Sequence, residues 1–142
     1  MQVQEIMTRG AEVIDPNTTI RDAARKMRAD NIGALPVGEN DRLVGMVTDR
    51  DIVVRAVAEN RAAGNTAVRE VMSERVYYCF DNDDVEDAAK VMAEHQVRRV
   101  PVVNRDKRLV GMIALADLGR SGVSVAMKAL GGVSEPTEQP RR

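Results

Sequence analysis

Thr48 and Asp51 place a hydroxyl and a carboxylate three positions apart, a spacing that can serve binding chemistry. They follow the apolar stretch 43–47, which predicts a strand, and they stand where a helix is expected to begin. The first N–H groups of a helix have no intrahelical partner and carry partial positive charge, which suits an anion. The Thr48 hydroxyl can donate to a phosphate, and the Asp51 carboxylate can accept both hydroxyls of a ribose. Alternatively, Thr48 only caps the helix and Asp51 only complements its dipole.

The chain is a tandem repeat of about sixty residues per copy, so this corner occurs twice. Most of the match appears after a shift of sixty-five residues, and it resumes after one extra residue near Lys107. The matched stretches are Val3–Met7 with Val68–Met72, Asp22–Ala24 with Asp87–Ala89, Pro36–Val37 with Pro101–Val102, Arg42–Met46 with Arg108–Met112, and Asp51 with Asp117. Recurrence of the corner favours a role in binding over capping alone.

Each copy predicts the element order β-α-β-β-α. In the first copy, apolar residues at helical spacing follow Ile20, two strands flank the polar turn 39–42, and a closing helix covers 49–59. One copy has too little core to fold alone, so the two copies are expected to pack with pseudo-twofold symmetry and form two equivalent clefts. The predicted fold class is α+β, an α/β sandwich of two such motifs.

The predicted domain boundaries follow the repeat. They are motif 1 over residues 1–60, a linker over 61–67, motif 2 over 68–121, an extra C-terminal helix over 122–130 and a disordered tail over 131–142. Small and polar residues predict the linker, and glycine, proline and polar residues predict the tail.

Composition and charge exclude several classes of partner. The chain has 142 residues, with 21 basic and 22 acidic side chains, so it lacks the basic surface that nucleic-acid binding requires. Trp, Tyr and Phe together number three, which argues against base stacking. No apolar run approaches the length of a membrane span. The single cysteine, Cys79, excludes an internal disulfide and a multi-cysteine zinc site, and it is expected to be buried. We therefore expect a soluble cytoplasmic protein with no nucleic-acid or membrane partner.

The repeat resembles the cystathionine-β-synthase (CBS) domain, here as the tandem pair called a Bateman module. The resemblance rests on the glycine-to-aspartate corner 45–51 and on the hydrophobic-Pro-Val strands 35–37 and 100–102, and it extends from about Val3 to Leu118. Small stand-alone bacterial two-CBS proteins of the hypoxic response protein type are the most similar in layout. The stretches that carry this likeness are Asn31–Pro36, Thr48–Val53 and Glu94–Pro101.

This resemblance implies a non-catalytic regulatory or sensor module. Its ligand would be an adenosine-containing molecule, namely AMP, ADP, ATP or S-adenosylmethionine, bound in the clefts between the two motifs, and no obligatory cofactor or metal is implied. In the family, the Thr and Asp of one corner hold phosphate and ribose, while the first strand and hydrophobic-Pro loop of the other motif hold adenine. Carried over to this sequence, the first site comprises Thr48, Asp51, Val76, Tyr77, Arg98, Arg99, Val100 and Pro101.

The second site departs from the pattern and is predicted to be weaker. Ala114 stands where the first copy has Thr48, and Gly33-Ala34 stands where the second copy has Arg98-Arg99. A hydroxyl and two guanidinium groups that could bind phosphate are therefore missing. The residues of this site are Val13, Ile14, Gly33, Ala34, Leu35, Pro36 and Asp117. We expect it to be empty or to take a nucleoside without strong phosphate contacts.

Several side chains have alternative interpretations. Arg98 and Arg99 alternate at a strand start, so one of them can face the cleft while the other pairs on the surface. His95, the only histidine, is better explained by a helix C-terminus than by phosphate binding. Asp49 and Asp51 suit a helix dipole better than Mg²⁺. Catalysis is not expected, because the histidine has no evident Ser or Cys companion.

The alternative function is a ligand-free dimeric structural or interaction protein. Ile52, Val53, Val54 and Val57, together with 118–130, would supply apolar surface for a homodimer, and CBS pairs commonly associate through their helices. No effector domain is evident in this sequence, so a regulatory output is expected to pass through a separate effector protein or through a change of oligomer.

Overall fold

The computed structural model describes residues 1–10, 13–120, 122 and 131. Contacts divide the chain into two compact units. The first-repeat unit contains described residues 13–76, and the second-repeat unit contains residues 1–10 with the chain from Tyr77 onward. Apart from Gly122 and Gly131, the predicted extra helix and tail lie outside the described residues. No helix among the described residues is both long enough and apolar enough to cross a membrane.

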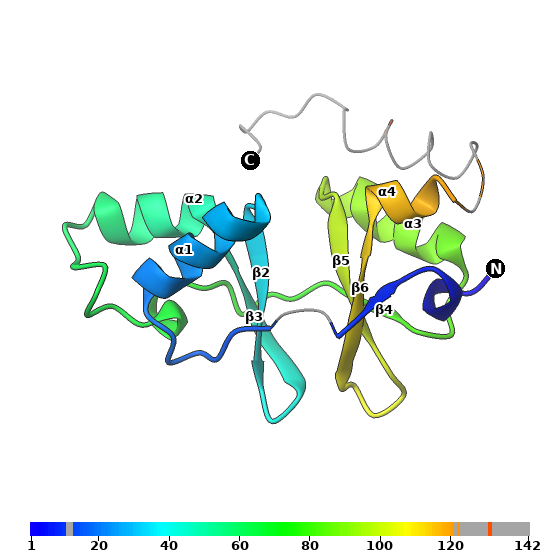
Figure 1. The fold of residues 1–142 in the computed structure, drawn as a ribbon, viewed down its shortest axis with the longest axis horizontal. Helices are drawn as coiled ribbons and strands as arrows, with labels where there is room; N and C mark the ends of the chain where they lie inside the picture. Colours follow the sequence, from blue (N-terminus) through cyan, green and yellow to red (C-terminus); the bar gives the residue numbers. More distant parts are fainter. Residues whose placement is uncertain (11–12, 121, 123–130, 132–142) are drawn as a thin grey trace. The chain divides into compact units, whose positions relative to one another are not determined.

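The first-repeat unit packs helices against an antiparallel strand pair (Figure 1). Its strands are β2 (Ala34–Glu39) and β3 (Arg42–Thr48), and its helices are α1 (Ile20–Asp30) and α2 (Asp49–Ile52). A π-helical segment, Val53–Val57, continues α2, so the predicted helix over 49–59 forms with a change of hydrogen-bonding pattern and ends at Val57. A 3-10 helix covers Val68–Glu70. In place of a predicted first strand, Ile14 makes an isolated parallel bridge with Val37.

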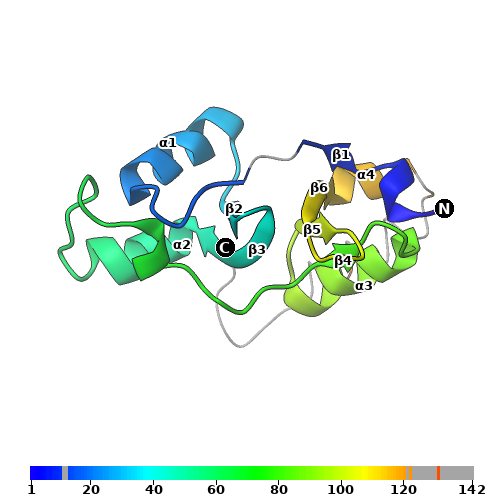
Figure 2. The ribbon, with the colours of Figure 1, turned by 90° about the horizontal axis from the view of Figure 1, so that it is seen from below.

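The second-repeat unit contains a four-stranded sheet in the order β1-β6-β5-β4. The strands are β1 (Thr8–Arg9), β4 (Cys79–Phe80), β5 (Arg99–Val103) and β6 (Leu109–Ala114), and the helices are α3 (Val85–His95) and α4 (Leu115–Leu118). Pairing is antiparallel for β1 with β6 and for β5 with β6, and parallel for β4 with β5. Figure 2 shows β1, from the start of the chain, beside β6.

Each unit has its own aliphatic core, as the scarcity of aromatic residues requires. The first-repeat core includes Ile20, Leu35 and Val47, and the second-repeat core includes Met92, Val100 and Ile113. All six side chains are almost fully buried. Burial of such side chains is the main stabilising contribution to a fold of this size.

Two matched segments are exchanged between the repeats. Val3 and Met7 precede motif 1 in the sequence but belong to the second-repeat core, and Val68 and Val71 precede motif 2 but belong to the first-repeat core. The predicted boundaries 1–60 and 68–121 follow sequence similarity, whereas the compact units follow this exchange. Similarity shows which segments are alike and does not show against which copy each one packs.

Two matched glycines make room for the exchanged segments. A Cβ added at Gly45 would lie 2.9 Å from the Ser73 carbonyl oxygen, and one added at Gly111 would lie 2.7 Å from the Thr8 carbonyl oxygen. Both distances are shorter than real Cβ contacts, and the contacted atoms are backbone. Glycine at these positions therefore allows a neighbouring backbone to approach closely.

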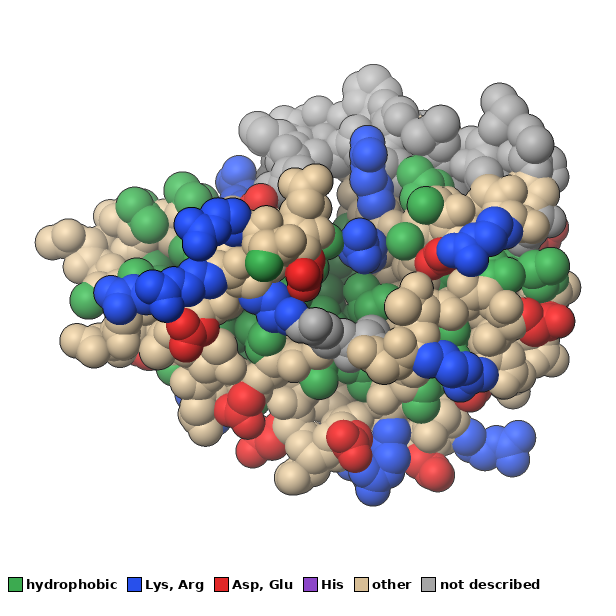
Figure 3. All heavy atoms as spheres, in the orientation of Figure 1, with side chains coloured by type: hydrophobic (Ala, Val, Ile, Leu, Met, Phe, Trp, Pro, Cys, Tyr) green, Lys and Arg blue, Asp and Glu red, His purple; other side chains and the backbone are tan. Residues whose placement is uncertain are grey.

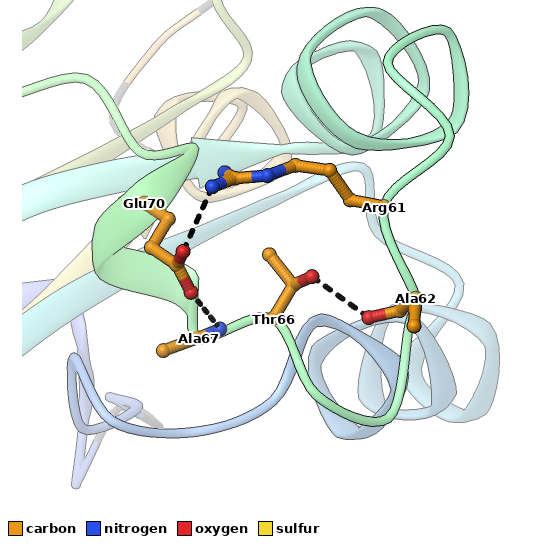
Figure 4. Close-up of polar contacts among 5 residues, drawn as sticks. All are labelled: Arg61, Ala62, Thr66, Ala67 and Glu70. Carbon is orange, nitrogen blue, oxygen red and sulfur yellow. Dashed lines mark hydrogen bonds and ion pairs between the residues drawn. The ribbon is translucent and has the colours of Figure 1, made fainter.

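The predicted linker 61–67 is fixed against α1. Backbone N–H groups at the start of α1 donate to it, from Ile20 to the Thr66 oxygen at 2.9 Å and from Arg21 to the Ala63 oxygen at 3.2 Å. The buried Thr66 hydroxyl donates to the Ala62 oxygen at 2.7 Å, as Figure 4 shows. These bonds occupy backbone groups at the helix start that otherwise lack partners.

Cys79 is buried and reduced in β4, as its neighbours predict. Burial raises the pKa of its thiol from 9.0 to about 12, and the carboxylates of Asp83 and Asp87 add to the increase. A buried thiol that stays protonated behaves as a small apolar residue. The predicted α+β fold class is confirmed, because strands and helices form in both units.

Candidate functional site

Thr48 and Asp51 form a reciprocal pair where β3 ends and α2 begins. The Thr48 hydroxyl oxygen accepts from the Asp51 backbone N–H at 3.0 Å, and Asp51 Oδ2 accepts from the Thr48 N–H at 2.9 Å. This arrangement is a capping box, which a Thr-x-x-acid sequence specifies locally. Thr48 and Asp51 therefore cap α2, which is compatible with both interpretations of the corner.

Capping leaves part of this corner available to a ligand. The Thr48 hydroxyl hydrogen and Asp51 Oδ1 have no hydrogen-bond partner among the described residues, and both side chains are half-buried. A hydroxyl can donate while it accepts, and a carboxylate has about four acceptor positions on its two oxygens. The corner can therefore cap α2 and still offer one donor and one acceptor.

Gly33 lies against the same corner. The Asp49 N–H donates to the Gly33 oxygen at 2.9 Å, and a Cβ at Gly33 would come within 2.9 Å of Asp49 Oδ2. Asp49 Oδ1 accepts from the Arg50 N–H at 2.8 Å. A side chain at position 33 would therefore clash with the Asp49 carboxylate, and glycine avoids this clash. Sequence reasoning assigned Gly33 to the second site, as a position without a guanidinium group, and did not predict its contact with Asp49.

The second-repeat corner, between β6 and α4, has the same cap without the hydroxyl. Asp117 Oδ2 accepts from the Ala114 N–H at 2.8 Å, and Asp117 Oδ1 pairs with the Arg120 guanidinium group. Asp117 is buried, whereas the Arg120 side chain is largely exposed. Both carboxylate oxygens are engaged, so this corner offers less to a ribose than the Asp51 corner does. Sequence reasoning missed Arg120, because its counterpart in the first copy is Val54.

The other residues predicted for the first site are divided between the two compact units. Val76 ends the first-repeat unit and is half-buried, and Tyr77 begins the second main segment of the other unit and is also half-buried. Val100 and Pro101 are buried in β5, where Pro101 pairs with Met112. These positions give Tyr77 partial access to solvent and leave Val100 and Pro101 mainly within the sheet.

Arg98 and Arg99 are both exposed at the start of β5. The Arg98 carbonyl oxygen accepts from the Leu115 N–H at 2.8 Å, and Arg99 is paired with Ala114 in the sheet register. The two arginines therefore flank the second-repeat corner through their backbones. Exposure does not distinguish between them as ligand-binding residues.

His95 ends α3, as its helix C-terminal interpretation requires, and its ring stacks on Tyr77. The ring centroids are 4.8 Å apart, with an interplanar angle of 19°. This contact was not predicted, because the two residues are eighteen positions apart and no periodicity relates them. Stacking orients the Tyr77 ring, which the resemblance assigned to the adenine site.

Apart from Asp117, which lies in the second-repeat unit, the residues predicted for the second site lie in the first-repeat unit, in β2 or near it. Leu35 and Pro36 are buried in β2, and Ala34 is paired with Thr48 in the sheet register. Ile14 is buried, whereas Val13 is 42% exposed. Leu35 belongs to the first-repeat core, so its main role in the unit is packing.

The chain belongs to the CBS domain family. The family model described as "CBS domain" matches residues 3–57 and 68–121. The CBS domain-containing protein YhcV of Bacillus subtilis is 44% identical over 122 residues, which is 86% of each chain. Hypoxic response protein 1 of Mycobacterium tuberculosis is 41% identical over 118 residues, which is 82% of each chain.

Solved CBS structures have the same fold. Hypoxic Response Protein I with two coordinated zinc ions gives a TM-score of 0.76 at 39% identity, covering 86% of this chain and 99% of the other. CBSX2 in complex with AMP gives 0.71 at 27% identity, covering 84% and 94%. The CBS domain pair of MJ0100 in complex with 5′-methylthioadenosine and S-adenosyl-L-methionine gives 0.71 at 28% identity, covering 85% and 94%. In the described part of the present chain, no three His, Cys, Asp or Glu side chains are grouped to hold a metal ion.

Proposed function

We propose that this chain is a non-catalytic regulatory module that binds an adenosine-containing ligand, one of AMP, ADP, ATP or S-adenosylmethionine. The observation that carries the proposal is the Thr48–Asp51 corner, which retains a hydroxyl donor and a carboxylate oxygen after capping its helix. Support comes from two related CBS structures, one in complex with AMP and the other with 5′-methylthioadenosine and S-adenosyl-L-methionine.

In this proposal, Asp51 accepts the ribose hydroxyls and Thr48 donates to a phosphate or its equivalent. Tyr77, held by its stack on His95, would contact adenine, and Arg98 or Arg99 would pair with phosphate. The Asp117 corner would bind more weakly, because Arg120 occupies one carboxylate oxygen and Ala114 has no hydroxyl. Regulation would pass to a separate effector protein, and the expected location is the cytoplasm.

The test is a thermal-shift screen against AMP, ADP, ATP, NAD and S-adenosylmethionine. A ligand that binds only the folded state stabilises it by about 2.7 kcal/mol at one hundred times its dissociation constant. The shift should disappear in Asp51→Asn, which keeps an oxygen to accept from the Thr48 N–H and so preserves the cap. Asp117→Asn is the matched control and should keep the shift. If millimolar concentrations of all five compounds leave the melting temperature unchanged, this function is wrong.

The second candidate function is a dimeric interaction protein, and one observation favours it. Val53, Val54 and Val57 on the π-helical segment are 56%, 46% and 66% exposed. Adjacent exposed apolar side chains often mark an interaction surface. Light scattering over a range of concentrations measures self-association independently of any ligand.

A further inference from the structure

An apolar groove lined by arginines lies on the helices of the first-repeat unit. Its volume of about 420 Å³ falls in the range of about 300–1,000 Å³ that is typical of small-molecule sites. Its apolar lining comes from α1, from α2 and from the chain beyond α2, through Ile20, Ala24, Ile52, Val57 and Ala63. Four arginines also line it, namely Arg21, Arg25 and Arg28 of α1 and Arg61. Figure 3 shows basic side chains gathered over α1.

The matched positions of the second-repeat unit are covered by the chain itself. Ala89, which matches Ala24, is 1% exposed, and Leu118, which matches Ile52, is completely buried. In the first-repeat unit, Ala24 is exposed and Ile52 is half-buried. Val57, which also lines the groove, is 66% exposed. The first copy therefore leaves open an apolar surface that the second copy fills.

The arginines of α1 are not required by the shared fold. At the positions that match Arg21, Arg25 and Arg28, the second copy has glutamate, lysine and alanine. One of the three positions stays basic, and one changes the sign of its charge. A cluster of guanidinium groups beside an open apolar surface is thus particular to the first copy.

The positive charge of the groove is only partly compensated within the unit. Arg61 pairs with Glu70 at 2.9 Å, as Figure 4 shows, and Arg25 lies 3.7 Å from Asp22. The other two arginines have no acidic partner among the residues that the structure describes, and both are exposed; they are Arg21 and Arg28. Two guanidinium groups therefore remain available to an anion.

Gly64 makes room for one of these guanidinium groups. A Cβ added at Gly64 would lie 3.0 Å from Arg21 Nη2 and 3.1 Å from Arg21 Cζ. The chain beside it is fixed to α1, because the Arg21 N–H donates to the Ala63 oxygen at 3.2 Å. The Arg21 guanidinium group therefore lies against the backbone next to Ala63, and a side chain at position 64 would displace it.

We propose that the groove binds a small amphipathic anion, a single alkyl chain that ends in a carboxylate or a phosphate. The chain covers Ala24, Ile52 and Val57, and each methylene that it buries raises the affinity about threefold to fourfold. The headgroup pairs with Arg21 or Arg28, because a guanidinium group forms bidentate hydrogen bonds with either anion. AMP has no alkyl chain, so this site is separate from the Thr48–Asp51 corner and the inference does not rest on nucleotide binding.

Titration with monomeric decanoate, followed by calorimetry, tests the proposal. Decanoate and decyl phosphate carry the same chain on two anionic headgroups, and both should bind. Octanoate should bind about tenfold more weakly than decanoate, because it lacks two methylenes. Decyltrimethylammonium, which has the same chain and the opposite charge, and inorganic phosphate, which has no chain, should not bind. Methyl NMR should show the largest changes at Ile20, Ile52 and Val57, which line the groove.

Two variants separate the apolar contribution from the charged one. Ala24→Leu fills the groove at an exposed helix position, where leucine is nearly as favourable as alanine, and it should abolish decanoate binding. Arg21→Gln with Arg28→Gln leaves the groove open and should weaken decanoate binding about tenfold. Arg42→Gln with Arg105→Gln, two exposed arginines that do not line the groove, is the charge-matched control and should bind like the wild type. Circular dichroism and urea denaturation establish that each variant is folded.

Several outcomes would overturn the proposal. A dissociation constant above about 1 mM for decanoate would exclude a site of this kind. Equal binding of decyltrimethylammonium would show that the arginines play no part, and unchanged binding by Ala24→Leu would place the ligand elsewhere. Cosedimentation with phosphatidylglycerol vesicles, without binding of monomeric decanoate, would show that the basic groove contacts a membrane surface instead.

The same samples separate this inference from the nucleotide proposal. Decanoate binding that is unchanged in Asp51→Asn, together with a thermal shift by AMP that persists in Ala24→Leu, supports two separate sites. Displacement of bound decanoate by AMP would show that the two ligands share one site and would overturn this inference. Decanoate binding without any nucleotide shift in the wild type would overturn the nucleotide proposal alone.

Discussion

The two strand–helix corners have nearly the same backbone conformation, and they differ in which polar side-chain atoms remain free to bind a ligand. Thr48 has φ −117° and ψ 163°, and Ala114 has φ −111° and ψ 160°. In each corner the aspartate three residues later accepts a hydrogen bond from the backbone N–H of that residue, at 2.9 Å for Thr48 and 2.8 Å for Ala114. The aspartate side chain therefore caps the helix in both copies. Capacity for a ligand depends instead on the Thr48 hydroxyl and on whether another side chain occupies the second carboxylate oxygen.

The largest expected effect on stability comes from substituting the two matched glycines, Gly45 and Gly111, which make room for the exchanged segments. Gly45→Ala and Gly111→Ala would each place a Cβ against a backbone oxygen, and each should lower the free energy of unfolding by about 1–3 kcal/mol. Urea denaturation measures this change. Gly119→Ala is the control, because Gly119 already has a right-handed helical conformation and alanine should cost little there. If only one of the two glycines is sensitive, the two exchanged segments are not equivalent in their contribution to stability.

Exchanging the capping residues should move stability in opposite directions. Thr48→Ala removes a side-chain cap and should destabilise the fold by about 1 kcal/mol, while Ala114→Thr adds one and should stabilise it by a similar amount. Thr48→Ala should also weaken binding of AMP more than binding of adenosine, because the lost hydroxyl serves phosphate. Equal losses for both ligands in calorimetry would contradict the phosphate role of Thr48.

Removing Arg120 should make the second corner more like the first. Arg120→Ala frees Asp117 Oδ1, so calorimetry with adenosine should show a second binding event or a several-fold gain in its affinity. Arg105→Ala, which removes another exposed arginine from the same unit, should leave binding unchanged. Identical isotherms for wild type and Arg120→Ala would show that Arg120 does not limit this corner.

At neutral pH the smallest effect is expected at Cys79, which takes the repeat position of Ile14, because its contribution changes only in alkaline solution. Its thiol pKa is about 12 in the folded chain, against an ordinary value of 9.0 that applies after unfolding. Stability should therefore not depend on this group below about pH 9, and it should decrease as the pH rises from 9 toward 12. Cys79→Ala should remove that part of the alkaline decrease, measured by denaturation at several pH values. Rapid alkylation of the folded protein at pH 8 would contradict the protected thiol.

The sequence predicts the elements and the corner because both depend on local patterns. Apolar spacing places α1 after Ile20, and Thr-x-x-Asp specifies the cap at Thr48. The stack of Tyr77 on His95 and the pairing of Arg120 with Asp117 were not predictable in the same way, because the first joins distant residues and the second has no counterpart in the other copy.

The exchange of segments also sets an order of assembly during synthesis. Thr8 pairs with Met112, so the sheet of the second-repeat unit is incomplete until more than one hundred further residues have been made. At about 5–20 residues per second, the first strand waits roughly 5–20 s for its partner. The described residues of the first-repeat unit, 13–76, are all made before then. Residues 1–10 are therefore made before the rest of their unit and are among the last of the described residues to reach their packed position.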